Sequence, residues 1–263
     1  MPHLTALQML LSVLSGGVVG FVLGLIGGGG SILAVPLLLY VVGVHDAHVV
    51  IGSTALAVAA NAYVNLLPHW RQGHVRWKAG VAFALPGAAG AYLGTVMGKM
   101  ANDRVILFLF ALLMLVIAIR MWRSQRTGET GHGVHPVRLG RVVPAGLGTG
   151  LVAGFFGIGG GFLIVPGLVF SAGLPMAEAI GTSLFSVGTF GLTTAVSYAL
   201  SGMVDWLIVL LYMGGGVLGG VFGVYACTRL GRDTRRLQRL FSGVLVLVAG
   251  YMLYVNVLAW LGR

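Results

Sequence analysis

Six long apolar stretches run through this sequence, and they leave few folds open to it. A helix needs about 20 mostly apolar residues to span the hydrocarbon core of a bilayer. Only 8% of the residues are charged and 57% are apolar, whereas a soluble domain carries about 25% charge. The sequence therefore predicts an all-α multi-pass membrane protein and excludes a water-soluble globule. The stretches lie at residues 49–67, 79–98, 105–122, 179–199, 206–227 and 240–260.

Two further apolar runs, at about 5–43 and 142–172, are interrupted by glycine clusters. The first of them holds 39 residues, and as a single helix it would be about 58 Å long. That length is nearly twice the hydrocarbon thickness of about 30 Å. A re-entrant hairpin, whose two helical arms enter and leave the membrane on one side, fits each run better. The chain is thus expected to hold about eight helical membrane segments.

The second half of the chain repeats the first, at an offset of 130 residues that becomes 129 further along. Each half holds one interrupted run and three uninterrupted helices. We therefore divide the chain into a first repeat at 1–122, a linker at 123–141 and a second repeat at 142–263, which together form one membrane domain. The matched residues of the first copy are Gly16, Gly20, Gly24, Gly27, Gly29, Gly30 and Pro36 at offset 130, and Gly52, Ser53, Thr54, Gly73, Trp77, Gly90 and Gly94 at offset 129.

The distribution of Lys and Arg favours inverted repeats over parallel ones. If the halves are inverted, the loops at 69–78, 120–141 and 228–239 lie on one side and hold 13 of the 16 Lys and Arg residues. The positive-inside rule assigns such loops to the cytoplasm. A parallel arrangement would pair the basic loop 69–78 with loop 200–206, which has no basic residue. We expect a protein of the cell membrane with both termini outside the cytoplasm. The formal net charge of +10 then reflects membrane orientation rather than nucleic-acid binding.

The glycine clusters that break the two runs are the first candidate for a site. They read Gly27-Gly28-Gly29-Gly30-Ser31 in the first half and Gly157-Ile158-Gly159-Gly160-Gly161 in the second. A returning half-helix, at about 31–43 or 161–172, would begin near the midplane with unpaired backbone N–H groups and partial positive charge. Two such ends facing each other would bind an anion. The alternative is that the glycines only let helices pack closely.

Hydroxyl and amide side chains on the next helices extend this candidate site. Gly52-Ser53-Thr54 and Gly181-Thr182-Ser183 open equivalent helices, and neutral donors suit a partly dehydrated anion. The alternative is that such hydroxyls bond to carbonyls of their own helix or join helices together. The candidate substrate-binding residues are Gly27, Gly28, Gly29, Gly30, Ser31, Ser53, Thr54, Asn61, Gly157, Gly159, Gly160, Gly161, Thr182, Ser183 and Ser186.

Acidic and basic residues do not occur deep within the predicted spans. Asp46 and Glu178 lie at the starts of two helices, where they complement the helix dipole or, alternatively, relay protons. Coupling of transport to protons or to sodium stays open. The single cysteine, Cys227, excludes an intrachain disulfide, and no cluster of His and Cys predicts a metal or another cofactor.

The glycine pattern resembles that of a known family, the TauE/SafE sulfite exporters, over essentially the whole chain. The resemblance implies a secondary carrier that moves sulfite, sulfoacetate or other organosulfonates, usually outward. It also implies that the glycine turns and the hydroxyl motifs contact the substrate. The residues that carry the resemblance are Gly20, Gly24, the cluster 27–31, Pro36 and Gly52-Ser53-Thr54, and in the second copy Gly150 to Pro166 with Gly181-Thr182-Ser183.

We therefore expect a secondary transporter, and an exporter, for small sulfur-containing anions that the two glycine turns bind at the midplane. The sequence has no G-x-x-x-x-G-K-[ST] motif and thus no P-loop for ATP. The alternatives are an anion channel and a permease for another small anion. A membrane-embedded enzyme would need a nucleophile with a base, or a metal cluster, and the sequence offers neither.

Overall fold

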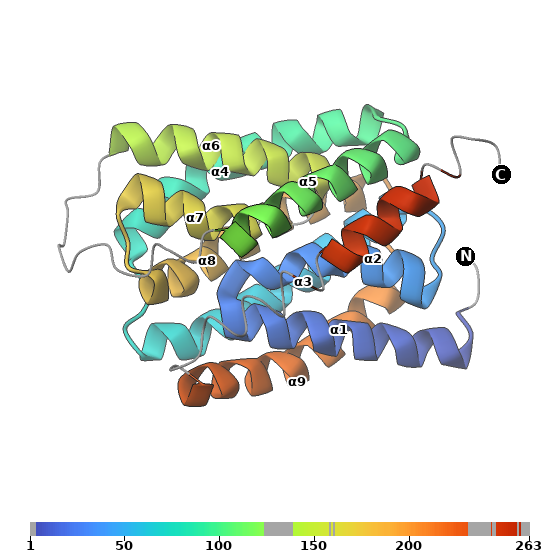
Figure 1. Ribbon diagram of the computed structural model, residues 1–263, viewed down its shortest axis with the longest axis horizontal. Coiled ribbons are helices and arrows are strands. Elements are labelled where there is room, and N and C mark those ends of the chain that lie inside the picture. The colour runs from blue at the N-terminus through green and yellow to red at the C-terminus, as the bar shows by residue number, and fades with distance from the viewer. Residues whose placement is uncertain are drawn as a thin grey trace. The chain divides into compact units, whose positions relative to one another are not determined.

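Every element of the computed structural model is a helix within the residues that it describes (Figure 1). These are residues 4–123, 139–157, 159, 161–230, 243, 246–256 and 258. Most of the predicted linker and most of the basic loop 228–239 lie outside them. The elements are α1 (Ala6–Ile26), η1 (Gly27–Leu33), α2 (Ala34–Pro36), η2 (Leu37–Val42), α3 (Ala47–Arg71), α4 (Trp77–Met100), α5 (Asp103–Arg123), α6 (Leu139–Phe156), α7 (Gly161–Ala172), α8 (Met176–Leu200) and α9 (Trp206–Leu230), followed by an apolar helix at Val246–Asn256.

The chain forms two compact units, and both halves of the sequence contribute to each. The larger unit holds Met1–Met100 and Gly133–Cys227, and therefore α1 to α4 and α6 to α9. The smaller unit holds Ala101–His132 and Thr228–Arg263, and therefore α5 and the last helix. The compact units thus cut across the repeats that the sequence suggests. All candidate site residues lie in the larger unit.

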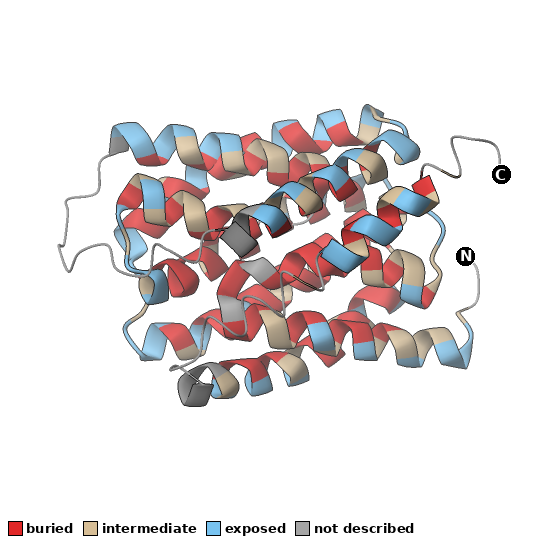
Figure 2. Cartoon of the chain, in the orientation of Figure 1, coloured by how far each residue is buried: buried red, intermediate tan, exposed pale blue. Residues whose placement is uncertain are grey.

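Within the described ranges, five helices are long and apolar enough to cross a membrane. Large apolar side chains on their outward faces are exposed, such as Leu85 at 66% and Leu200 at 85% (Figure 2). Exposed apolar surface of this extent is typical of contact with lipid. These features confirm the predicted helical, multi-pass membrane protein. The five spans are Ala6–Leu25, Ala47–Arg71, Trp77–Met100, Met176–Leu200 and Trp206–Ala226.

The first interrupted run forms a hairpin with two unlike arms. α1 ends at Ile26 and is followed by Gly27, whose φ of 74° is favourable for glycine. The chain then returns through 3-10, α and π turns, because η1, α2 and η2 follow one another directly. Gly43 ends this arm beside the Gln8 side chain, so the chain comes back to the beginning of α1.

The second run forms a similar hairpin with a regular returning arm. The chain turns at Gly157, and α7 then begins at Gly161, as the sequence predicts. Pro166 lies inside α7, so this arm is helical before the proline as well as after it. The first arm differs because Ser31 stands at the position of Gly161, and its hydroxyl donates to the Gly28 carbonyl at 2.9 Å. This bond over three residues stabilises the tighter 3-10 turn.

Glycine-lined contacts join each hairpin to a helix of the other half. Residue numbers rise together along these contacts, so α1 runs parallel to α9 and α6 runs parallel to α4. A Cβ at the glycines concerned would overlap the facing backbone, so close packing explains them. The facing pairs are Gly16 with Tyr212, Gly20 with Gly216 and Gly24 with Gly220, and at the equivalent positions Gly146 with Phe83, Gly150 with Gly87 and Gly154 with Ala91.

α3 and α8, which hold equivalent positions in the two halves, pack against each other in opposite directions. Gly52 near the start of α3 faces Tyr198 near the end of α8, whereas Tyr63 further along α3 faces Gly188. The apolar windows of α3 and α8 are 72% and 67% buried, against at most 44% in the other three spans. This antiparallel pair therefore forms the core of the larger unit.

Candidate functional site

The two glycine turns meet inside the larger unit. We refer to residues 27–31 as the first tip and to residues 157–161 as the second tip. The backbones of Gly28 and Gly161 are in direct contact, and a Cβ on either residue would overlap the backbone of the other. Gly160 lies outside the described residues, and the exposure of Gly29 is not described. The other glycines of the tips and Ser31 are buried: Gly27, Gly28, Gly30, Ser31, Gly157, Gly159 and Gly161.

The backbone conformation requires glycine at three positions of the tips. Gly27, Gly157 and Gly159 have φ values of 74°, 66° and 64°, in the left-handed region that residues with a Cβ rarely adopt. Gly27 and Gly157 are equivalent in the repeat, so the two turns begin in the same way. Close helix packing is therefore not the whole explanation of these clusters.

Each tip is held by a helix of the opposite half. The Gly28 N–H group donates to Ser183 Oγ of α8 at 3.3 Å. The same hydroxyl donates to the Ile180 carbonyl at 2.7 Å, so it links the first tip to α8. Ile180 also packs against this turn, and Ile51 of α3, its equivalent, packs against Gly157 of the second tip.

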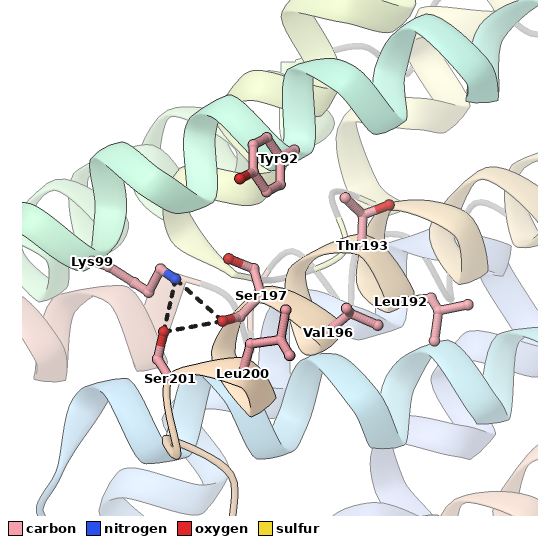
Figure 3. A pocket seen from close by; sticks show the side chains of 8 residues that line it. All are labelled: Tyr92, Lys99, Leu192, Thr193, Val196, Ser197, Leu200 and Ser201. Carbon is pink, nitrogen blue, oxygen red and sulfur yellow. Dashed lines mark hydrogen bonds between the residues drawn. The ribbon is translucent and has the colours of Figure 1, made fainter.

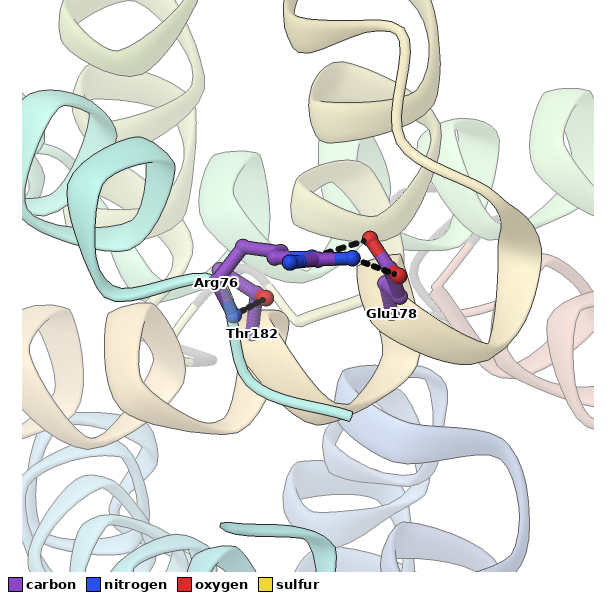
Figure 4. Close-up of polar contacts among 3 residues, drawn as sticks. All are labelled: Arg76, Glu178 and Thr182. Atoms are coloured by element: carbon purple, nitrogen blue, oxygen red, sulfur yellow. Dashed lines mark hydrogen bonds and ion pairs between the residues drawn. The ribbon is translucent and has the colours of Figure 1, made fainter. Parts of the chain in front are cut away.

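The other hydroxyls of the two motifs bond to backbone groups. Thr182 Oγ1 accepts from the Arg76 N–H at 2.9 Å (Figure 4), and Ser53 Oγ, its equivalent, accepts from the Asp205 N–H at 2.9 Å. Arg76 and Asp205 directly precede α4 and α9, so both hydroxyls fix the start of a helix in the other half. Thr54 donates to a carbonyl one turn back in its own helix at 2.7 Å. These three hydroxyls therefore make bonds of the kind that the structural alternative predicts.

Four buried polar side chains have no hydrogen-bond partner for some or all of their polar atoms within the described part of the chain. Two belong to the candidate set: Asn61, with both amide atoms unpaired, and Ser186, one turn beyond Ser183 on α8. The other two, Asn65 and His69, follow Asn61 at helical spacing. The sequence places Asn65 one turn beyond Asn61 and His69 at the end of the helix, and neither is among the candidate substrate-binding residues. All four are at most 4% exposed. An unpaired buried polar group costs about 1–3 kcal/mol, so these side chains mark a region with capacity for water or a ligand.

The two acidic candidates lie near the surface and have structural partners. Glu178 accepts from the Arg76 guanidinium at 2.7 and 2.6 Å, and these bonds raise the pKa of Arg76 (Figure 4). Asp46 accepts from the Val49 N–H at 3.0 Å and caps the N-terminus of α3. Among the residues with described positions, no group of three or more His, Cys, Asp or Glu side chains is placed to hold a metal ion.

A shallow groove of about 430 Å³ lies between α4 and α8 (Figure 3). Lys99 is its one charged lining residue, and the Lys99 ammonium donates to the Ser197 carbonyl at 3.2 Å and to the Ser201 hydroxyl at 3.0 Å. The residues that line this groove belong to neither tip. The groove is therefore separate from the candidate site.

Comparisons with known proteins agree with the resemblance seen in the glycine motifs. The chain matches the family described as "Sulfite exporter TauE/SafE" over residues 12–252. A "Probable membrane transporter protein" of Xylella fastidiosa (strain 9a5c) is 45% identical over 253 residues, which cover 95% of this chain and 97% of that protein. The "Probable membrane transporter protein YunE" of Bacillus subtilis (strain 168) is 25% identical over 273 residues, with 95% and 99% covered. No solved structure matches. The names of the family and its relatives also confirm the prediction that the chain is a transporter and not an enzyme.

Proposed function

Since the chain belongs to the TauE/SafE sulfite exporter family and is a membrane transporter, we propose that it exports small sulfur-containing anions as a secondary carrier. Sulfite, sulfoacetate and other organosulfonates form the proposed substrate class. The family description names sulfite, and the printed names of the relatives add membrane transport without a substrate. Inorganic and organic members of this class share a compact anionic group with several oxygen acceptors, which suits a site made of N–H donors.

The contact between Gly28 and Gly161 is the observation that carries this proposal. It brings two glycine turns together where backbone groups, and not bulky side chains, face each other. α7 begins at Gly161, so its first N–H groups and the positive end of its dipole lie at this contact. The substrate-binding residues that we propose are the glycines of the two tips and Ser31, with Ser183, Ser186 and Asn61 beside them.

Transport requires the two tips to separate, because their backbones touch in this conformation. An anion placed between them would replace a backbone contact with charge-assisted hydrogen bonds from both sides. The parallel pairs α1–α9 and α4–α6 each carry one arm of a hairpin, so each pair is suited to move as a rigid body. We propose that motion of these pairs opens the tips to one side of the membrane and then to the other.

We further propose that the halves are inverted repeats with re-entrant hairpins. The contacts between the halves recur with exchanged roles at offsets of 129 and 130, which is the pattern of a two-fold relation. The equivalent helices α3 and α8 are antiparallel, and a two-fold axis that relates antiparallel helices is perpendicular to them. Such an axis lies in the membrane plane. With the return of Gly43 to Gln8, this arrangement supports eight membrane segments, cytoplasmic basic loops and both termini outside.

Cysteine labelling tests this topology with a matched pair of sites. Gln72 and Ser201 are exposed, equivalent at offset 129, and lie in short loops after α3 and α8. In a Cys227→Ser background, we expect Gln72→Cys to react with an impermeant maleimide from the cytoplasmic side and Ser201→Cys from the other side. Reaction of both from one side would contradict inversion, because inverted equivalents lie on opposite faces.

A binding and flux experiment on the purified full chain tests the function itself. We expect sulfite and sulfoacetate to raise the unfolding temperature, since a ligand at about 100 times its Kd stabilises by about 2.7 kcal/mol, and acetate to have no effect. In proteoliposomes, labelled anion should exchange against unlabelled anion and saturate with concentration. Flux without saturation would favour the channel, and equal stabilisation by acetate would favour a permease for another anion.

A further inference from the structure

We infer that His69 is a proton-binding site and that its proton is coupled to the anion at the first tip. The inference rests on the proposed anion site. Asn61, Asn65 and His69, which we name the α3 polar stripe, lie four residues apart along one face of α3. The stripe runs from the middle of this central helix to its last turn.

The burial of His69 calls for more than a packing explanation. The side chain is 4% exposed, and both ring nitrogens have no partner among the described residues. It lies in α3, which is apolar and long enough to cross the membrane. An imidazole kept for structure alone would donate from one nitrogen and accept at the other. Ionisable side chains within spans are costly, and a function is the default explanation for them.

The surroundings of His69 place it next to the candidate anion site. Its ring faces the backbone of Gly24 in α1, at a geometry that falls short of a hydrogen bond. Gly24 lies one helical turn before Gly27, where the first tip begins. A positive charge on this ring would therefore attract an anion held at the first tip.

The rest of the stripe runs along the glycine face of α9. Asn61 packs on Gly216 and Asn65 packs on Gly220, so each amide lies against backbone rather than against an apolar side chain. The unpaired amide atoms are suited to hold water between the core and His69.

A second imidazole links His69 to the loop after α3. The rings of His69 and His74 are 6.1 Å apart, and His74 is only half-buried. His74 therefore offers a second imidazole within reach of both the exposed loop and the buried ring. We therefore place the entry of the proton at His74 and its binding site at His69.

Among the residues that the structure describes, few other charged groups face His69. α1 has no ionisable residue along its whole length, and Tyr225, beside the part of α9 that faces Gly24, is exposed. Arg71 on α3 is exposed as well. His74 faces the ring from the loop, and Glu178 acts on His74 from α8.

The proton step itself is an acid–base equilibrium of the imidazole ring. A proton from water at the loop adds to the lone pair of one ring nitrogen and gives a cationic ring. Burial disfavours a charged ring, and the bound anion together with the partly negative carbonyls at the C-terminal end of α3 offsets that cost. Because the anion and the proton favour each other's binding by the same factor, they cross together, and the outward gradient of the anion carries a proton with it. Loss of the proton to water on the other side restores the neutral ring.

The test compares accumulation with exchange in proteoliposomes, with the membrane voltage held at zero. Sulfoacetate is the probe, because it stays fully ionised between about pH 6 and about pH 8, where His changes charge. We expect wild-type protein to accumulate it on the alkaline side by up to about tenfold per pH unit for each proton carried. His69→Gln keeps a polar side chain that cannot bind a proton, so it should lose accumulation on the alkaline side. Exchange at equal pH and saturating anion concentration should persist, with a weaker apparent affinity for the anion. The matched control is His45→Gln, an exposed residue before α3 that should behave as wild type.

Each other outcome contradicts the inference. Accumulation by His69→Gln at the wild-type level would overturn it, and so would loss of exchange at saturating anion concentration, because removal of the ring charge weakens anion binding without blocking the carrier. Wild-type exchange without any response to the pH gradient would overturn it and leave the proposed function standing. Failure of wild-type protein to bind or exchange either sulfite or sulfoacetate would instead refute the proposed function, and this inference with it.

Discussion

The two halves share their backbone contacts and differ in the side chains of their central helices. On α3, the polar stripe has unpaired atoms at all three positions. The equivalent positions of α8 hold Phe190, Thr194 and Tyr198, and each has a partner. The Phe190 ring stacks on Phe83 at 6.3 Å, the Thr194 hydroxyl lies 3.1 Å from that of Thr95, and the Tyr198 hydroxyl lies 3.4 Å from His48 Nδ1.

This difference shows that the two halves can share a backbone arrangement without sharing the polar groups of their central helices. Contacts that set the fold occur twice, such as those of Ser53 and Thr182 with a helix start of the other half. Unpaired polar atoms, which cost stability, are concentrated on α3. We propose that the tips serve the anion from both halves and that the first half alone adds the proton. Each prediction below tests that division of roles between the two halves.

The largest expected effect is loss of transport when either tip gains bulk. Gly28→Leu and Gly161→Leu place a side chain where the two backbones touch, so both should reduce anion exchange to background. Gly148→Leu and Gly214→Leu are matched controls, because their Cβ positions have no neighbour within 4 Å among the described atoms. Exchange in proteoliposomes, normalised to inserted protein, is the measurement. Wild-type exchange by either tip variant would remove the tips from the site.

The next largest effect is expected at Asn61, where stability and transport should change in opposite directions. Asn61→Leu removes unpaired polar atoms, so we expect a stabilisation of about 1–3 kcal/mol together with slower transport. Phe190→Leu at the equivalent position loses buried ring contacts and should cost about 1–2 kcal/mol. Thermal unfolding and exchange are measured on both. Destabilisation by Asn61→Leu would mean that the Asn61 amide stabilises the fold, as the Phe190 ring does at the equivalent position.

A smaller loss of stability, equal in the two halves, is expected at the equivalent hydroxyls Ser53 and Thr182. Ser53→Ala and Thr182→Val each remove one hydroxyl that accepts from a backbone N–H at 2.9 Å. Each should lower the free energy of unfolding by about 1 kcal/mol and leave the exchange rate close to wild type. Calorimetry on both variants would show the equality. A strong loss of exchange in one of them would place that hydroxyl at the substrate.

The smallest effect is expected at Glu178. Its ion pair with Arg76 is exposed, and exposed pairs contribute little to stability. Glu178→Gln should therefore leave both the unfolding temperature and the pH dependence of accumulation nearly unchanged. A shifted pH profile would assign proton coupling to this carboxylate instead of His69.

Much of the architecture could be predicted from the sequence, because long apolar runs and clusters of glycine are compatible with few structures in a membrane. The tip clusters and the start of α7 at Gly161 follow from the spacing of glycines, which also predicts close helix packing. The partners of the packed helices and their parallel direction do not follow from that spacing. The division into two units could not be predicted, since contacts between distant segments decide it and no local pattern records them.

The α3 polar stripe was only partly predictable, and proline is the reason. The apolar pattern suggests a helix that ends at residue 67, because proline normally disfavours continuation. The structure continues α3 through Pro68 to Arg71, which carries His69 into the buried interior. The irregular first arm was also missed, since the bond from Ser31 to Gly28 depends on a turn that only the folded backbone provides.

The pairing of α1 with α9 has a consequence for how the protein is made. About 180 residues separate the end of α1 from the start of α9. At a synthesis rate of about 5–20 residues per second, the glycine surface of α1 has no α9 to pack against for roughly 10 to 40 seconds. Glycine has no polar side chain that would be unpaired in lipid, so α1 can stay without its partner helix for this time. The packing of α1 is thus incomplete until α9 has left the ribosome.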